Sequence, residues 1–156
     1  MKKNSLIQSM GLIIIILFIC CGKCAMDYRY PIKLKNNSNH KIDVFVADHN
    51  KGYPDTTLTS QRATVNIDIQ KVHYEDFSLE YEKIFSYLPS DTLSIYIFHT
   101  DTLNKYSWAI IKEKYMVLKR YDLSLDDLRK LDYTVPYPPS SAMSNMKMFP
   151  PYNKEE

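Results

Sequence analysis

The sequence predicts one domain of the α+β class, with a mainly antiparallel β-sheet and two or three short helices. Three observations support this prediction. The chain has 156 residues, of which 45% are hydrophobic and 24% are charged, and this suits a single globular domain. Several short segments alternate apolar and polar residues as half-buried strands do. Others repeat apolar residues at helical spacing. A multidomain enzyme, a repeat array and a polytopic membrane protein are therefore excluded.

The first predicted elements are two strands, over residues 30–35 and 42–46, in which apolar and polar side chains alternate. The polar residues 36–39 between them are typical of a turn. We therefore expect the two strands to form a β-hairpin. After a loop, residues 63–69 alternate in the same way and predict a third strand.

Helices and strands are both predicted in the second half of the chain. Apolar residues on one helical face indicate a helix over 80–88, which Pro89 ends. A capping-box sequence that starts at Ser124 indicates a short helix that ends at Leu131. Residues 116–123 either continue a preceding helix or form a strand, and we favour the strand. The other predicted elements are a strand over 92–99, a helix over 108–115 after Ser107, and an edge strand over 133–137.

The N-terminus is typical of a secretion signal. Lys2 and Lys3 precede an uncharged apolar run over residues 10–21, which is shorter than the roughly 20 residues that span a bilayer. The run ends in cysteine rather than at a small-residue cleavage site. This pattern resembles a bacterial lipoprotein signal, in which the cysteine at the cleavage point carries the lipid. We predict lipidation of Cys21, with Cys20 as the second choice.

A lipid anchor on this cysteine would hold the protein on a membrane of the cell envelope. We expect the outer membrane rather than the inner one, with the domain facing the periplasm or the cell surface. If residues 6–9 extend the apolar run, an uncleaved single-pass anchor is the alternative. Cys24 completes a CxxC sequence with Cys21, but no second cysteine pair follows that would complete a zinc site.

The C-terminal segment, residues 138–156, is predicted to be a disordered tail rich in proline and methionine. Five of the eight prolines lie from Pro136 onward, together with Met143, Met146 and Met148, and no periodic pattern is present. The chain is thus expected to divide into a signal peptide over 1–20, a tether over 21–29, one α+β domain over 30–137, and the tail over 138–156.

The charge balance excludes nucleic acid as a partner. Without Lys2 and Lys3, the 20 basic residues fall to 18, which equals the 18 acidic residues. Nucleic-acid binding relies on clustered positive charge that neutralises phosphates, and no such cluster is visible.

The sequence contains no strong catalytic or metal-binding pattern. Its four histidines form no HxH or HExxH pair, and its three glycines leave little scope for a phosphate-binding loop. We therefore expect no catalytic site, no metal and no cofactor. The alternative is a small hydrolase that uses His99 beside Asp101, because a histidine next to an acid can act as a general base.

Thirteen tyrosines are many for a chain of this length. Aromatic faces stack on sugars and fill interfaces, although tyrosine is also a common half-buried strand residue. Tyr53, Tyr106 and Tyr121 are the candidate ligand-contact aromatics.

Three segments, over residues 88–98, 105–108 and 118–128, resemble a group of small uncharacterised cell-envelope lipoproteins of Bacteroidota. The Asn36 turn and the 133–138 ending are similar too. The resemblance implies an envelope location and a shared fold, and it implies no activity or site residue. Asp-Thr sequences that resemble the O-glycosylation sites of exported proteins from this phylum make Thr56, Thr92 and Thr102 candidate acceptors.

We therefore expect a lipid-anchored cell-envelope protein with a non-enzymatic binding or structural role. Its expected partners are the membrane, through the lipid anchor, and an envelope protein or a glycan. The alternatives are the small envelope hydrolase with His99 and Asp101, and an immunity-type lipoprotein.

Overall fold

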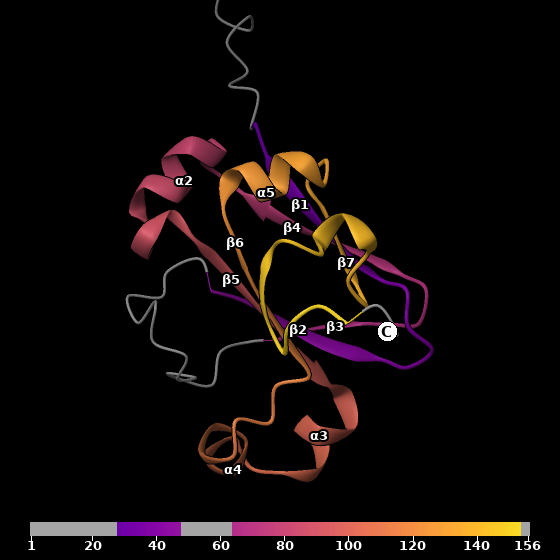
Figure 1. The fold of residues 1–156 in the computed structure, drawn as a ribbon. Helices are drawn as coiled ribbons and strands as arrows, with labels where there is room; N and C mark the ends of the chain where they lie inside the picture. Colours follow the sequence, from indigo (N-terminus) through magenta and orange to yellow (C-terminus); the bar gives the residue numbers. More distant parts are fainter. Residues whose placement is uncertain (1–27, 48–63, 154–156) are drawn as a thin grey trace, which may run out of the picture.

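The computed structural model of the chain describes residues 28–47 and 64–153, which form two β-sheets and four short α-helices (Figure 1). The smaller sheet has the strand order β4-β1-β7 and consists of Tyr30–Asn36 (β1), Val72–Phe77 (β4) and Thr134–Tyr137 (β7). The larger sheet has the order β3-β2-β5-β6-β8 and consists of Ile42–Ala47 (β2), Val65–Ile67 (β3), Leu93–His99 (β5), Lys119–Leu123 (β6) and Lys147–Phe149 (β8).

The helices are Tyr81–Tyr87 (α2), Thr100–Lys105 (α3), Trp108–Glu113 (α4) and Leu125–Lys130 (α5), with two 3-10 turns at Pro89–Asp91 and Ser141–Met143. Among the described strands, β1 and β7 run parallel, and every other pair is antiparallel. The α+β class with mainly antiparallel strands is therefore confirmed. The described part has four helices where the sequence predicts two or three.

The main hydrophobic core is built from the facing sides of the two sheets. Ile32 and Leu34 of β1 and Ile42 and Val44 of β2 belong to it, and each is at most 3% exposed. Helices α2 and α5 lie together at one end of the molecule, where Phe85 of α2 joins the core (Figure 1). Burying a side chain of this size contributes about 1.5–3 kcal/mol, so this core is the main source of stability.

A second, smaller core lies on the opposite face of the larger sheet. Because side chains alternate along a strand, Phe45 of β2 and Tyr96 and Phe98 of β5 project away from the main core. They pack with Ile111 of α4. Helices α3 and α4 lie at the end of the molecule opposite α2 and α5 (Figure 1). Tertiary contact of these helices with the sheet creates the pocket described below.

The predicted hairpin between the first two strands is wrong, although both strands exist. Strand β1 pairs with β4 and β7, whereas β2 pairs with β3 and β5. The connection turns a corner from one sheet to the other because Asn36, which is fully buried, holds it there. The Asn36 side-chain Nδ2 lies 2.9 Å from the His40 carbonyl oxygen, 3.1 Å from that of Ile67 and 3.2 Å from that of Asp68.

Most of the other predicted elements are confirmed with small shifts of their ends. The third strand is β3, the helix before Pro89 is α2, and the strand over 92–99 is β5. The favoured strand over 116–123 is β6, and the last edge strand is β7. The capping box is present in α5, where Asp127 N donates to Ser124 Oγ and Ser124 N donates to the Asp127 carboxylate. The helix after Ser107 is α4, but Ser107 makes no side-chain cap hydrogen bond.

The prediction of a disordered tail is wrong for residues 138–153. Strand β8 pairs with β6, and Met143, Met146 and Met148 are all buried in the main core. Methionine is flexible and fills irregular gaps, so a segment can pack well without a periodic apolar pattern. Residues 154–156 lie outside the described part.

The predicted signal peptide, and the tether as far as residue 27, also lie outside the described residues. Within the ranges that the structure describes, no helix has the length and apolar character needed to cross a membrane.

Candidate ligand-binding pocket

A pocket of about 260 Å³ lies on the outer face of the larger sheet, where β2 and β3 meet α3 and α4. Its volume is slightly below the roughly 300 Å³ at which pockets for drug-sized ligands begin, so it suits a small molecule. The residues that line it are Asp43, Thr64, Asn66, Thr100, Leu103, Asn104, Tyr106, Trp108 and Ile111.

The polar side of this pocket is organised around the carboxylate of Asp43. Asp43 is only 8% exposed. Its carboxylate accepts hydrogen bonds from Thr64 Oγ1 at 3.2 Å, Asn66 Nδ2 at 3.0 Å and Thr100 Oγ1 at 2.6 Å. Asn66 Nδ2 also donates to Thr100 Oγ1 at 3.1 Å. These bonds fix four polar side chains in one arrangement before any ligand arrives.

Strand geometry explains why these groups meet. Ile42 and Val44 point into the main core, so Asp43 between them projects to the other face. In the sheet register Asp43 is the direct partner of Asn66 on β3 and of Phe98 on β5. Thr100 follows β5 as the first residue of α3, which places its hydroxyl beside the same carboxylate.

The apolar side of the pocket is aromatic and belongs to the α3–α4 unit. Trp108, the first residue of α4, contacts Phe98 edge to face, with ring centroids 5.9 Å apart. The indole Nε1 of Trp108 is buried and has no hydrogen-bond partner among the described residues. Tyr106 lies between the two helices and carries the Lys105 ammonium 5.3 Å from its ring centroid. The lining of the pocket thus includes two aromatic side chains.

A second group of titratable residues surrounds His99, at the end of β5. His99 stacks on His40 with ring centroids 4.3 Å apart, and its Nδ1 lies 4.0 Å from an Asp101 carboxylate oxygen. Burial lowers the pKa of His40, and His99 lowers it further, while Asp101 acts in the opposite direction. The Asp101 side chain is 90% exposed.

The hydrolase alternative gains no support from this arrangement. Along β5, His99 alternates with Phe98, so its ring lies on the opposite face of the sheet from the pocket. The His99–Asp101 separation is longer than a hydrogen bond. The Asp101 side chain is also largely in solvent, where a charged pair contributes little.

Of the two predicted ligand-contact tyrosines that the structure describes, Tyr106 and Tyr121, one is found at the pocket. Tyr106 lines it. Tyr121 is fully buried and donates from its hydroxyl to the Pro136 carbonyl at 3.0 Å, so the prediction of ligand contact is wrong for Tyr121. Cys20, Cys21, Tyr53 and Thr56 lie outside the described residues.

Two of the candidate glycosylation sites are described. Thr92 precedes β5 and donates from its hydroxyl to the Ser90 carbonyl at 2.8 Å. Thr102 is half-buried within α3. Modification at either residue stays a prediction.

Sequence reasoning did not single out Asp43, Asn66, Thr100, Asn104 or Trp108 as site residues. These residues come from β2, β3, α3 and α4. They lie close together because β2 pairs with both β3 and β5. A weak signal was available in the single tryptophan of the chain. Tryptophan is enriched where binding energy is concentrated.

No protein-family model, curated protein or solved structure matches the chain. Within the described ranges, no group of three or more His, Cys, Asp or Glu side chains is placed to hold a metal ion.

Proposed function

We propose that this chain is a lipid-anchored cell-envelope protein with a non-enzymatic binding role, and that its pocket binds one sugar unit of a glycan. The observation that carries the proposal is the meeting of a hydrogen-bonded polar cluster with two aromatic side chains in one small cavity. Asp43, Asn66 and Thr100 form the polar side, and Tyr106 and Trp108 form the aromatic side.

A sugar ring matches this combination of surfaces. It presents hydroxyl groups at its edge and apolar C–H groups on its faces. Carboxylate, amide and hydroxyl side chains can exchange hydrogen bonds with the hydroxyls, and aromatic rings bury the C–H faces.

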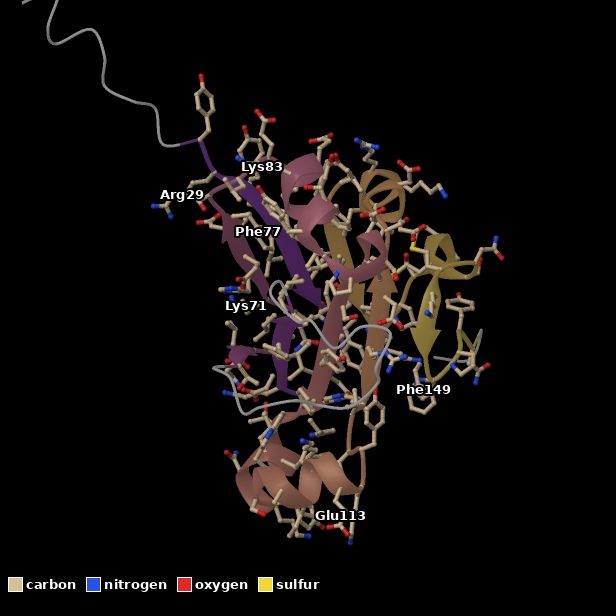
Figure 2. All side chains as sticks on the ribbon, turned by 90° about the vertical axis from the view of Figure 1, so that its left-hand side faces the viewer. Arg29, Lys71, Phe77, Lys83, Glu113 and Phe149 are labelled. Atoms are coloured by element: carbon tan, nitrogen blue, oxygen red, sulfur yellow. The ribbon has the colours of Figure 1, made fainter. Side chains whose placement is uncertain are left out.

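The position of the pocket agrees with an anchor at the N-terminus. Strand β1 starts at the end of the molecule that carries α2 and α5, and α3 and α4 lie at the other end (Figure 1). Figure 2 shows the same separation from the side, with Arg29 and Lys83 at one end and Glu113 of α4 at the other. A lipid on Cys21 would therefore leave the pocket on the side turned away from the membrane.

The chemistry of the lining favours binding over catalysis. Acid–base catalysis on a glycosidic bond uses two carboxyl groups that face each other across the substrate. Within the part of the chain that the structure describes, Asp43 is the one carboxylate that lines this pocket, and three donors already hold it in place. Such a group is suited to fixing the orientation of a ligand.

The fluorescence of Trp108 offers a direct test. Trp108 is the only tryptophan in the chain, so the emission of the full chain in detergent micelles reports on the pocket without labelling. Titration with a panel of neutral monosaccharides should change this emission saturably for at least one of them. The Tyr106→Ala variant should lose most of that response.

A matched control is Tyr87→Ala, because Tyr87 lies on α2 and is 69% exposed. It should respond as the wild type does. A wild-type protein that shows no saturable response to any sugar would contradict the proposal, and so would an unchanged response in Tyr106→Ala.

A further inference from the structure

The pocket contains a buried negative charge that has no cationic partner in the described part of the chain. Among the described residues, the donors that bond the Asp43 carboxylate are the neutral groups of Thr64, Asn66 and Thr100. None of the described residues that line the pocket is a lysine, an arginine or a histidine. The hydrogen bonds orient and stabilise the carboxylate, but they supply no positive charge.

Asp122, a second buried carboxylate on the same face of the sheet, has a cationic partner. Asp122 is 3% exposed, and the Arg120 guanidinium lies 3.1 Å from its carboxylate. Ser94 Oγ donates to the second oxygen of Asp122 at 2.8 Å. Buried charges are normally paired because burial of an isolated charge is expensive. Asp43 departs from this pattern, because it lines a cavity and has no such cation beside it among the described residues.

We propose that the ligand supplies the missing positive charge, and that the pocket selects an amino sugar whose amine is free and protonated. This inference rests on the proposed function and names the ligand class of the same site. An ammonium group can donate to Asp43 in a charge-assisted hydrogen bond. Trp108 can attract the same cation through its ring face. N-acetylation removes the charge, and a sugar carboxylate is repelled by Asp43.

A ligand series tests the inference on the full chain in detergent micelles, with Trp108 emission as the signal. The probes are glucose, glucosamine, N-acetylglucosamine and glucuronate, together with ethanolamine as an amine without a sugar ring. Glucosamine should bind at least about tenfold more tightly than glucose and N-acetylglucosamine. Glucuronate should bind more weakly than glucose.

The outcomes separate this inference from the function on which it rests. Equal affinity for glucose and glucosamine would overturn the inference and support sugar binding. No saturable response to any sugar would overturn the proposed function itself. If ethanolamine binds as tightly as glucosamine, the site recognises an amine alone, and the amino-sugar assignment is wrong.

The Asp43→Asn variant tests the residue. It keeps the size and one acceptor oxygen but removes the charge, so the advantage of glucosamine over glucose should disappear. The control is Asp132→Asn, because Asp132 is exposed and lies outside the pocket lining. That control should keep the full advantage. A wild-type preference in Asp43→Asn would overturn the inference, and if this variant fails to fold, the wild-type ligand series alone decides.

Discussion

His40 and His99 stack face to face, with their ring planes 8° apart and their centroids separated by 4.3 Å. His40 lies in the corner between β1 and β2, and His99 ends β5, so the stack joins that corner to the larger sheet. Tyr137 of β7 packs edge-on against His40 at 6.0 Å. The Nε2 atom of His40 is buried and has no hydrogen-bond partner among the described residues.

This arrangement predicts that the protein loses stability as the pH falls below about 6.5. The native pKa of His40 is lowered by burial first and by His99 second, with Asp101 opposing them. The unfolded chain therefore binds more protons in mildly acid solution than the native chain does. Above the pKa of His40 in the unfolded chain, His40 does not affect the free energy of unfolding. As the pH drops through that pKa the free energy of unfolding falls, and it levels off below the lower pKa of His40 in the native state.

The measurement is urea denaturation at several pH values between 7.5 and 5. The His40→Gln variant should show a smaller fall in the free energy of unfolding across this range than the wild type. His73→Gln is the control, because His73 lies on β4 and takes no part in the stack. If His40→Gln retains the wild-type dependence on pH, the assignment to His40 is wrong.

Disturbing the two buried carboxylates should change the free energy of unfolding to different extents. Arg120→Met leaves Asp122 buried without its cation and should lower the free energy of unfolding by about 3–5 kcal/mol. Asp43→Asn removes one acceptor oxygen together with the charge but leaves no buried ion unpaired, so the ligand-free protein should lose less, about 1–2 kcal/mol. Chemical denaturation of both variants checks this pair. Comparable destabilisation by the two changes would contradict the account of Asp43.

The corner between β1 and β2 should depend on a single side chain. Asn36 contacts three carbonyl oxygens through Nδ2, and its Oδ1 accepts from Ser38 N at 3.0 Å and from Ser38 Oγ at 2.6 Å. Asn36→Ala leaves several of these buried groups unsatisfied and should cost about 2–4 kcal/mol. Asn37→Ala, at an exposed neighbouring position, should change the free energy of unfolding by less than about 0.5 kcal/mol. Similar losses in both variants would show that Asn36 does not hold the corner.

The lipid anchor is tested by fractionation and mass spectrometry of the expressed full chain. Wild-type protein should remain with membranes and begin at an acylated Cys21. Cys21→Ala should leave the membrane fraction in an unlipidated form, whereas Cys24→Ala should behave as the wild type. Loss of the lipid in Cys20→Ala alone would instead assign the second-choice cysteine. Soluble wild-type protein that retains Met1 would contradict the anchor.

Local patterns in the sequence were sufficient for most individual elements. The capping box at Ser124 and Asp127 is read from four neighbouring residues, and the face of α2 is read from one helical repeat. Strand β4 was missed because its exposed positions include Val72 and Tyr74 while half-buried His73 and Glu75 alternate with them. This inverts the usual alternation of apolar residues inside and polar residues outside.

Pairing between distant segments explains the remaining errors. The hairpin prediction failed because Asn36 bonds to Ile67 and Asp68, about 30 residues further along the chain. Burial of Met143 and Met146 depends on the main core that other segments build. The polar half of the pocket has the same origin, since the neighbours of Asp43 are set by strand register. Tyr106 could be proposed from its residue type, but Asp43 could not.

The most direct test of the central claim is the indole resonance of Trp108 in a ¹H–¹⁵N spectrum of the full chain. One tryptophan gives one such resonance, and its N–H has no partner among the described residues. If the pocket binds an amino sugar, adding glucosamine should shift this resonance progressively and saturably. If the resonance stays in place while saturating glucosamine shifts backbone resonances elsewhere, the binding site is not this pocket.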